Sequence, residues 1–186
     1  MPGDAEATKQ RILEAAIAEF AARGSAGARI DRIAAAASAN KQLIYAYFGS
    51  KQALFGAAIE NQLERFHESV PFDPTRLADF AVDVYDFFAA HPELARLGGW
   101  HALEEEQREH PIPAIAEAWR ERVRAIARAQ RNGSVNAAIP APELLLFVFA
   151  VARAYVVTTP EVSEAARGGN ARRRKSVREA IQRLVG

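Results

Sequence analysis

The sequence contains no cysteine and only one methionine among its 186 residues. Without cysteine, a disulfide scaffold, a thiol nucleophile and a cysteine-ligated zinc site are all excluded. Long apolar runs are also missing. The longest one, Leu144 to Ala152, is bounded by Glu143 and Arg153, and it falls short of the ~18 residues that a membrane span needs. The N-terminal segment lacks the basic and apolar regions of a signal peptide. These absences predict a cytoplasmic protein with no membrane partner.

Residues that favour β-strands are scarce as well. Val, Ile and Thr together number 27, whereas alanine occurs 40 times and arginine 20 times. Alanine and arginine are strong helix formers, so the composition predicts an all-α protein. The net charge of +1 does not indicate a partner, but its distribution is uneven. Residues 32 to 59 include three basic side chains and no acidic one.

Apolar periodicity, proline and glycine divide the chain into about nine predicted helices. Pro71 to Pro74 forms the clearest linker. Gly98 and Gly99 weaken the helix that contains them, and the stretch between Pro160 and Gly169 has no clear element. The predicted helices cover residues 8–23, 30–36, 41–47, 51–70, 75–90, 93–108, 114–131, 142–157 and 170–185.

Two short helices, 30–36 and 41–47, are joined by a brief turn that predicts a helix-turn-helix. In such a motif the second helix enters the DNA major groove with its N-terminal residues toward the bases. Asn40 is a good N-cap for this helix, and the break at Gly49 and Ser50 places a second cap before the following helix. The candidate DNA contacts are Asn40, Lys41, Gln42, Tyr45, Tyr47 and, at the start of the next helix, Lys51.

The stretch Ile30 to Phe55, IDRIAAAASANKQLIYAYFGSKQALF, resembles the DNA-binding domain of the TetR family of bacterial repressors. The resemblance extends over about residues 8–66 and includes the Gly-Ser-Lys that opens the fourth helix. Two positions depart from the family pattern. Ala28-Arg29 stands where a hydroxyl residue is common, so Arg29 replaces it as a candidate phosphate contact. Ser38-Ala39 stands where Gly-Val is common.

The resemblance implies a DNA-binding domain at residues 1–50 and a helical ligand-binding and dimerisation domain at 51–186. It implies a transcriptional regulator, more often a repressor than an activator in this family, that binds an operator as a homodimer. A small apolar effector would bind among aromatic residues of the second half. The candidate effector residues are Phe88, Trp100, His101, Trp119, Phe147 and Arg153. The expected dimer faces carry Leu144, Phe147, Val148 and Val151 on one helix and Val177, Ile181 and Leu184 on the other.

Other interpretations are open. His101 and Glu105, four residues apart, could bind a metal with His110 as a third ligand, although a solvated helix face explains them better. The basic run Arg172 to Lys175 could contact nucleic acid or form a solvated helix edge. The main alternative function is a helical-bundle interaction protein with a purely structural hairpin. No motif of a catalytic site or cofactor site is present, so neither an enzyme nor a cofactor is expected.

Overall fold

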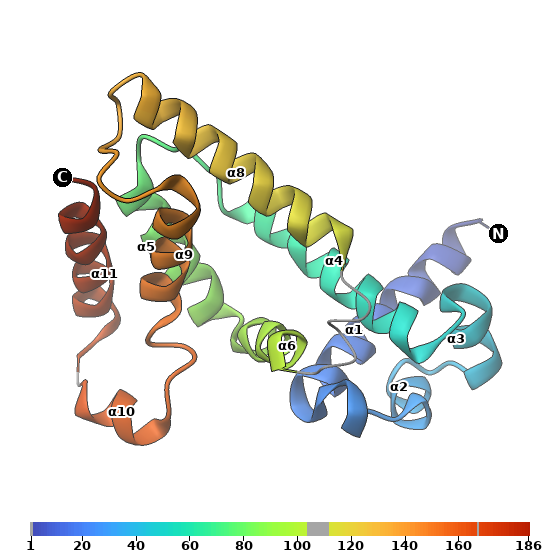
Figure 1. Cartoon of the computed structure of the whole chain (residues 1–186). Helices are drawn as coiled ribbons and strands as arrows, with labels where there is room; N and C mark the ends of the chain where they lie inside the picture. Colours follow the sequence, from blue (N-terminus) through green and yellow to red (C-terminus); the bar gives the residue numbers. More distant parts are fainter. Residues whose placement is uncertain (1, 104–111, 167) are drawn as a thin grey trace. The chain divides into compact units, whose positions relative to one another are not determined.

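The computed structural model describes residues 2–103, 112–166 and 168–186, and every regular element in these ranges is an α-helix (Figure 1). The all-α prediction is therefore confirmed. The helices are α1 (Pro2–Gly27), α2 (Ile30–Ala36), α3 (Lys41–Phe48), α4 (Lys51–Ser69), α5 (Leu77–Ala90), α6 (Pro92–Leu103), α8 (Pro113–Arg131), α9 (Ala141–Arg153), α10 (Pro160–Ala165) and α11 (Asn170–Val185).

Most predicted helices agree with the structure to within a few residues, and the differences have local causes. The first helix was expected to end at Gly24, where the backbone does leave helical geometry with φ of 69°. A further helical turn follows it, up to Gly27. The helix expected at 142–157 ends at Arg153, and residues 154–156 form a turn. The six-residue α10 lies in the stretch that showed no clear element.

The chain forms two compact units. Unit 1 comprises residues 1–65 and 93–112, and unit 2 comprises residues 66–92 and 113–186. Helix α4 contributes to both, because its residues up to Arg65 belong to unit 1 and those from Phe66 belong to unit 2. The predicted boundary at residue 50 divides the chain by function, and that division stays a prediction.

Unit 1 packs the first four helices and α6 around a small apolar core. The rings of Phe20 on α1 and Phe55 on α4 meet edge to face, with their centroids 5.0 Å apart. Ile33 of α2 and Ile44 of α3 are at most 1% exposed. Each short helix therefore buries an isoleucine in the core, and such a contact supplies roughly 1.5–3 kcal/mol by removing an apolar side chain from water.

Unit 2 is built around α5, which contacts both α9 and α11, while α8 packs on α9 (Figure 1). The Tyr85 hydroxyl donates to Oδ1 of Asn170 at 2.8 Å and joins α5 to the start of α11. No described helix of either unit is long and apolar enough to cross a membrane.

The expected dimer faces are wrong in most of their residues. Leu144 and Val148 of α9 and Val177 and Ile181 of α11 are at most 1% exposed, so they form the core of unit 2. The sequence showed correctly that these helices have apolar faces, but it could not show that α5 covers them. The exposed apolar side chains of α9 are instead Leu146 and Phe147, which are 54% and 42% exposed.

Candidate functional site

The turn between α2 and α3 is short and well satisfied by hydrogen bonds. Ser38 adopts a positive φ of 50°, a region that asparagine and glycine tolerate best. The N–H of Ala39 donates to the carbonyl of Ala34 at 2.9 Å. The N–H of Leu43 donates to Oδ1 of Asn40 at 2.8 Å, so Asn40 is the N-cap that the sequence predicted. The start of α3 is thereby held in a defined direction relative to α2.

The end of α3 and the start of α4 also follow the sequence signals. Gly49 has a φ of 77°, which ends α3. The hydroxyl of Ser50 accepts a hydrogen bond from the N–H of Ala53 at 3.0 Å and caps α4. These local signals are readable because each one acts on residues only three or four positions away.

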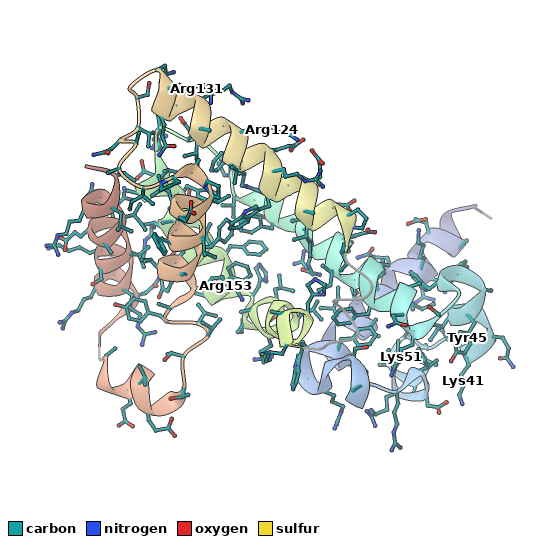
Figure 2. The ribbon with its side chains drawn as sticks, in the orientation of Figure 1. Lys41, Tyr45, Lys51, Arg124, Arg131 and Arg153 are labelled. Carbon is teal, nitrogen blue, oxygen red and sulfur yellow. The ribbon has the colours of Figure 1, made fainter. Side chains whose placement is uncertain are left out.

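Helix α3 presents a polar face away from the core. Ile44 faces inward, and Leu43, Tyr47 and Phe48 are half-buried. The exposed residues are Lys41, Gln42, Tyr45 and Ala46, and the Tyr45 side chain is 47% exposed. Figure 2 shows Lys41 and Tyr45 on the same side of the motif. Lys41, Gln42 and Tyr45, whose side chains are suited to contact bases, are therefore accessible.

Both predicted DNA-binding lysines have protein partners. The ammonium of Lys41 pairs with the carboxylate of Asp31 on α2. The Lys51 side chain is half-buried, and its Nζ donates to the carbonyl of Ser25 at 2.9 Å. Lys51 therefore links the start of α4 to the end of α1, a structural task that the sequence did not indicate. Arg29 lies at the N-cap of α2 with an exposed side chain.

Glu19 of α1 organises the entry to the motif. Its carboxylate accepts a hydrogen bond from the backbone N–H of Arg29 at 3.1 Å and from Nε of Arg32 at 2.6 Å. It also pairs with Nη2 of Arg32 at 2.5 Å and with Nε of Arg23 at 3.6 Å. Arg32 in turn donates to the carbonyl of Gly27 at 2.8 Å. We call these residues the Glu19 network; it holds the start of α2 against α1.

The protonation of Glu19 reflects this network. Partial burial raises the pKa of the carboxyl. The hydrogen bonds from Arg32 and from the Arg29 N–H, together with the charges of Arg32 and Arg23, lower the pKa by more than burial raises it. The net direction is downward from the usual 4.5. The carboxylate is therefore ionised throughout the neutral range, as the arginine contacts require.

The six predicted effector residues divide between the two units. Trp100 and His101 belong to unit 1, where Nε1 of Trp100 donates to the carbonyl of Ala21 at 3.3 Å. The His101 ring lies 6.1 Å from the ring of Phe55, measured between centroids. The other four residues belong to unit 2. Neither unit alone therefore brings the six residues together. The sequence did not indicate this division, because the contact between Trp100 and Ala21 joins residues 79 positions apart.

Unit 2 contains a continuous cluster of rings, which we call the aromatic cluster. Phe66 is at its centre, with ring centroids 5.2 Å from Phe87, 5.9 Å from Phe88 and 6.0 Å from Phe149. Trp119 lies 5.7 Å from Phe149. Two of the predicted effector residues, Phe88 and Trp119, therefore do meet in one cluster. Phe147 has no ring contact with it among the described residues.

Two arginines pack on this cluster. The guanidinium of Arg153 lies 5.1 Å from the ring centroid of Phe88, and that of Arg122 lies 5.6 Å from the centroid of Phe66. Burial lowers the pKa of both guanidinium groups, although both stay charged. The quadrupole of an aromatic ring attracts a cation over its face and offsets part of the lost hydration. Arg153 is one of the predicted effector residues, and Arg122 is not.

A groove with a volume of about 360 Å³ lies between the end of α4 and α8. Its size is within the ~300–1,000 Å³ typical of small-molecule sites. Burial, with the charge of Arg122, lowers the pKa of His67 at its edge, so the imidazole stays neutral at neutral pH. None of the six predicted effector residues lines the groove, which is formed by His67, Val70, Phe72, Ala118, Glu121, Arg122 and Ala125.

The predicted metal alternative cannot be followed in full, since Glu105 and His110 lie outside the described residues. Within the described ranges, no group of three or more His, Asp or Glu side chains could hold a metal ion. Three residues of the basic run on α11 have protein partners. Arg174 pairs with Asp86 at 3.1 Å, Lys175 pairs with Glu179 at 3.7 Å, and the guanidinium of Arg173 lies 5.4 Å from the ring centroid of Tyr155.

Comparison with known proteins defines the class. Residues 12–58 match the family described as bacterial regulatory proteins, tetR family. Residues 76–183 match the family described as tetracyclin repressor-like, C-terminal domain. The chain therefore belongs to the TetR family of helix-turn-helix transcriptional regulators.

Individual relatives agree with this assignment. The chain is 44% identical to the HTH-type transcriptional repressor SCO4008 of Streptomyces coelicolor, over 98% of this chain and 97% of the relative. The crystal structure of the transcriptional regulator SCO4942 from the same organism superposes with a TM-score of 0.84 at 33% identity, covering 96% of this chain and 98% of the other. FadR from Bacillus subtilis in complex with stearoyl-CoA shares the fold, with a TM-score of 0.72 at 18% identity and coverage of 93% and 97%.

Proposed function

We propose that this regulator is a dimeric, cytoplasmic repressor that releases its operator when a small, largely apolar molecule binds unit 2. The exposed polar face of α3 is the observation that carries DNA recognition. The repressor names of the relatives support the direction of regulation. Regulators of this class act without catalysing a reaction, which supports a non-enzymatic role. Footprinting on the DNA flanking its own gene tests the proposal, and absence of any protected sequence would refute it.

Gln42 is expected to read a base pair directly. Its amide is exposed on the first turn of α3, and a glutamine pairs bidentately with adenine. Gln42→Ala should cost about 1–3 kcal/mol of discrimination at one base pair. Binding to duplexes that vary at each operator position measures this loss.

Arg29→Ala is the matched comparison for Gln42. The Arg29 side chain is exposed, and the substitution keeps the N–H that donates to Glu19. The Arg29 variant should bind all DNA sequences more weakly by about the same factor, and the salt slope of binding should fall by about 1, as loss of one phosphate contact predicts. A Lys51 variant is less suitable for testing a phosphate contact, because the substitution also removes the hydrogen bond to the Ser25 carbonyl. Equal base preferences for the Gln42 variant and the wild type would contradict the docking model.

The effector is proposed to bind next to the aromatic cluster. Rings from α4, α5, α8 and α9 meet there, and the groove beside Arg122 opens close to Phe72, whose ring lies 5.7 Å from the guanidinium. FadR, which shares this fold, was crystallised in complex with stearoyl-CoA, and this supports an apolar effector. An effector that moves the DNA-binding state from 99% to 1% occupancy needs about 5.5 kcal/mol of differential affinity.

The two tryptophans provide a test of effector binding. Trp119 belongs to the aromatic cluster of unit 2, whereas Trp100 is hydrogen-bonded inside unit 1. Titration with hydrophobic compounds should change the fluorescence of a Trp100→Phe variant and leave that of a Trp119→Phe variant nearly unchanged. The same compound should release operator DNA in a mobility-shift assay. A compound that saturates the fluorescence change without weakening operator binding would break the link between the two events.

A further inference from the structure

The helix-turn-helix carries one acidic residue on an otherwise basic and neutral surface. Asp31 is the single acid between Ile30 and Ile59, a stretch that also includes Arg32, Lys41 and Lys51. DNA is a polyanion, so an acid within the binding motif weakens sequence-independent attraction to it. An acid at this place therefore calls for an explanation in terms of what it contacts.

Asp31 contacts the first residue of α3. Its carboxylate on α2 pairs with the ammonium of Lys41, across the turn that contains Ser38. Both side chains are more than half exposed, at 63% for Asp31 and 55% for Lys41. An exposed pair of this kind contributes little to stability, typically 0–1 kcal/mol. The pair is thus weak enough to open when DNA binds. Its main effect is on the binding of DNA, which competes with Asp31 for the Lys41 ammonium.

We propose that Asp31 is a specificity-determining residue, which withholds the Lys41 ammonium from the phosphates of unrelated DNA. A phosphate of unrelated DNA offers Lys41 one charge contact and must replace its existing contact with the Asp31 carboxylate, so the exchange adds little binding free energy. At the operator, Lys41 reaches a base edge while the rest of α3 is also seated, and several contacts repay the exchange. The inference rests on the DNA-binding function proposed above.

A helix-end role is the competing explanation for Asp31. An acid in the first turn of α2 interacts favourably with the helix dipole, whether or not it touches Lys41. Such a role predicts a change in thermal stability and no change in the choice between DNA sequences. The two explanations therefore separate in a binding experiment.

The test compares two probes. One is a duplex selected by enrichment from random sequences with the wild-type protein, and the other is an unselected random duplex of equal length. Asp31→Asn should raise affinity for the random duplex about three- to fivefold at 0.1 M salt, which the loss of an exposed ion pair can account for, and steepen its salt slope by about 0.9, the effect of one added phosphate contact. Affinity for the selected duplex should change by less, so the specificity ratio falls.

Two controls isolate the mechanism. Glu60→Gln removes an exposed acid from α4 of the same unit. It should change the affinity for either probe by no more than about twofold, which is less than the effect of one phosphate contact. In a Lys41→Met background, Asp31→Asn should lose most of its effect on the random duplex. An equal effect in both backgrounds would show that Asp31 acts by its own charge and would overturn the proposal.

The remaining outcomes are also decisive. A specificity ratio unchanged by Asp31→Asn in a protein that unfolds at the wild-type temperature would overturn the inference while leaving the repressor function intact. Failure of the wild-type protein to enrich any duplex would refute the proposed function itself. A thermal unfolding curve for each variant separates binding effects from loss of the folded motif.

Discussion

Replacing Glu19 with alanine will lower the free energy of unfolding by about 1.5–3 kcal/mol, the range for hydrogen bonds to a charged group. The substitution removes the acceptor for the Arg29 N–H and for Nε of Arg32. It also leaves the guanidinium of Arg32 with only the Gly27 carbonyl as a described partner. Since the Glu19 network holds the start of α2, operator affinity should fall as well. Chemical denaturation at neutral pH measures the stability change.

The pH dependence of this effect has a definite sign. The pKa of Glu19 is lowered in the folded protein, so its contribution is present above the unfolded-state pKa near 4.5 and is lost as the pH falls through the lower folded-state pKa. The stability difference between wild type and Glu19→Ala should stay constant from neutral pH down to about 5. Below 4.5 it should shrink.

Glu14→Ala is the matched control on the same helix. Glu14 is exposed, and its one described hydrogen bond comes from the neighbouring Gln10 at 3.3 Å. Its removal should change stability by less than about 0.5 kcal/mol, as is usual for surface positions. Equal losses for the two variants, or a Glu19 effect that does not change with pH, would show that the network is not a source of stability.

Introducing an aspartate at Phe147 will convert the proposed dimer into a monomer. Phe147 and Leu146 are the large exposed apolar residues of α9 in the described structure, and a charge there cannot be buried without a partner. A monomer occupies one half-site only, so operator affinity should fall by about 10²–10⁴, the usual gain from linked binding. Light scattering at micromolar concentration and operator titration measure the two effects together.

Val162→Asp is the control for the dimer face. Val162 of α10 is 56% exposed and belongs to the same unit, but it lies on a different helix. This variant should keep both the dimer mass and the operator affinity. A Phe147→Asp variant that remains dimeric would place the interface on another surface of unit 2, and a wild-type protein that is monomeric would remove the dimer from the proposal.

The sequence predicted those features whose causes lie within a few residues. Asn40 caps α3, Ser50 caps α4 and Gly49 ends α3, all as expected, because a cap acts on the next turn of its own helix. The exposed face of α3 was also predictable from spacing alone. Membership of the family followed from the same short stretch.

The contacts missed by the sequence join residues that are distant along the chain. Glu19 and Arg32 are separated by 13 positions, and Lys51 and Ser25 by 26. Neither pair leaves a periodic signal. The sequence indicated the apolar faces of α9 and α11, but an apolar face does not show which element packs on it. Helix α5 packs on these faces, where a second copy of the chain was expected. The hydrogen bond from Trp100 to the Ala21 carbonyl, which places Trp100 in unit 1 apart from the aromatic cluster, likewise had no sequence signal.

The continuity of α4 sets how movement can travel along the chain. Lys51 and Phe66 are 15 residues apart in one helix, which corresponds to a rise of about 22 Å. If an effector tilts the Phe66 end by about 10°, the Lys51 end moves by roughly 4 Å, comparable to the rise between neighbouring base pairs. Lys51 is tied to the end of α1, so α1 must follow. If the proposed effector acts through α4, a small adjustment at an aromatic ring would therefore displace the end of α4 that follows α3 in the chain.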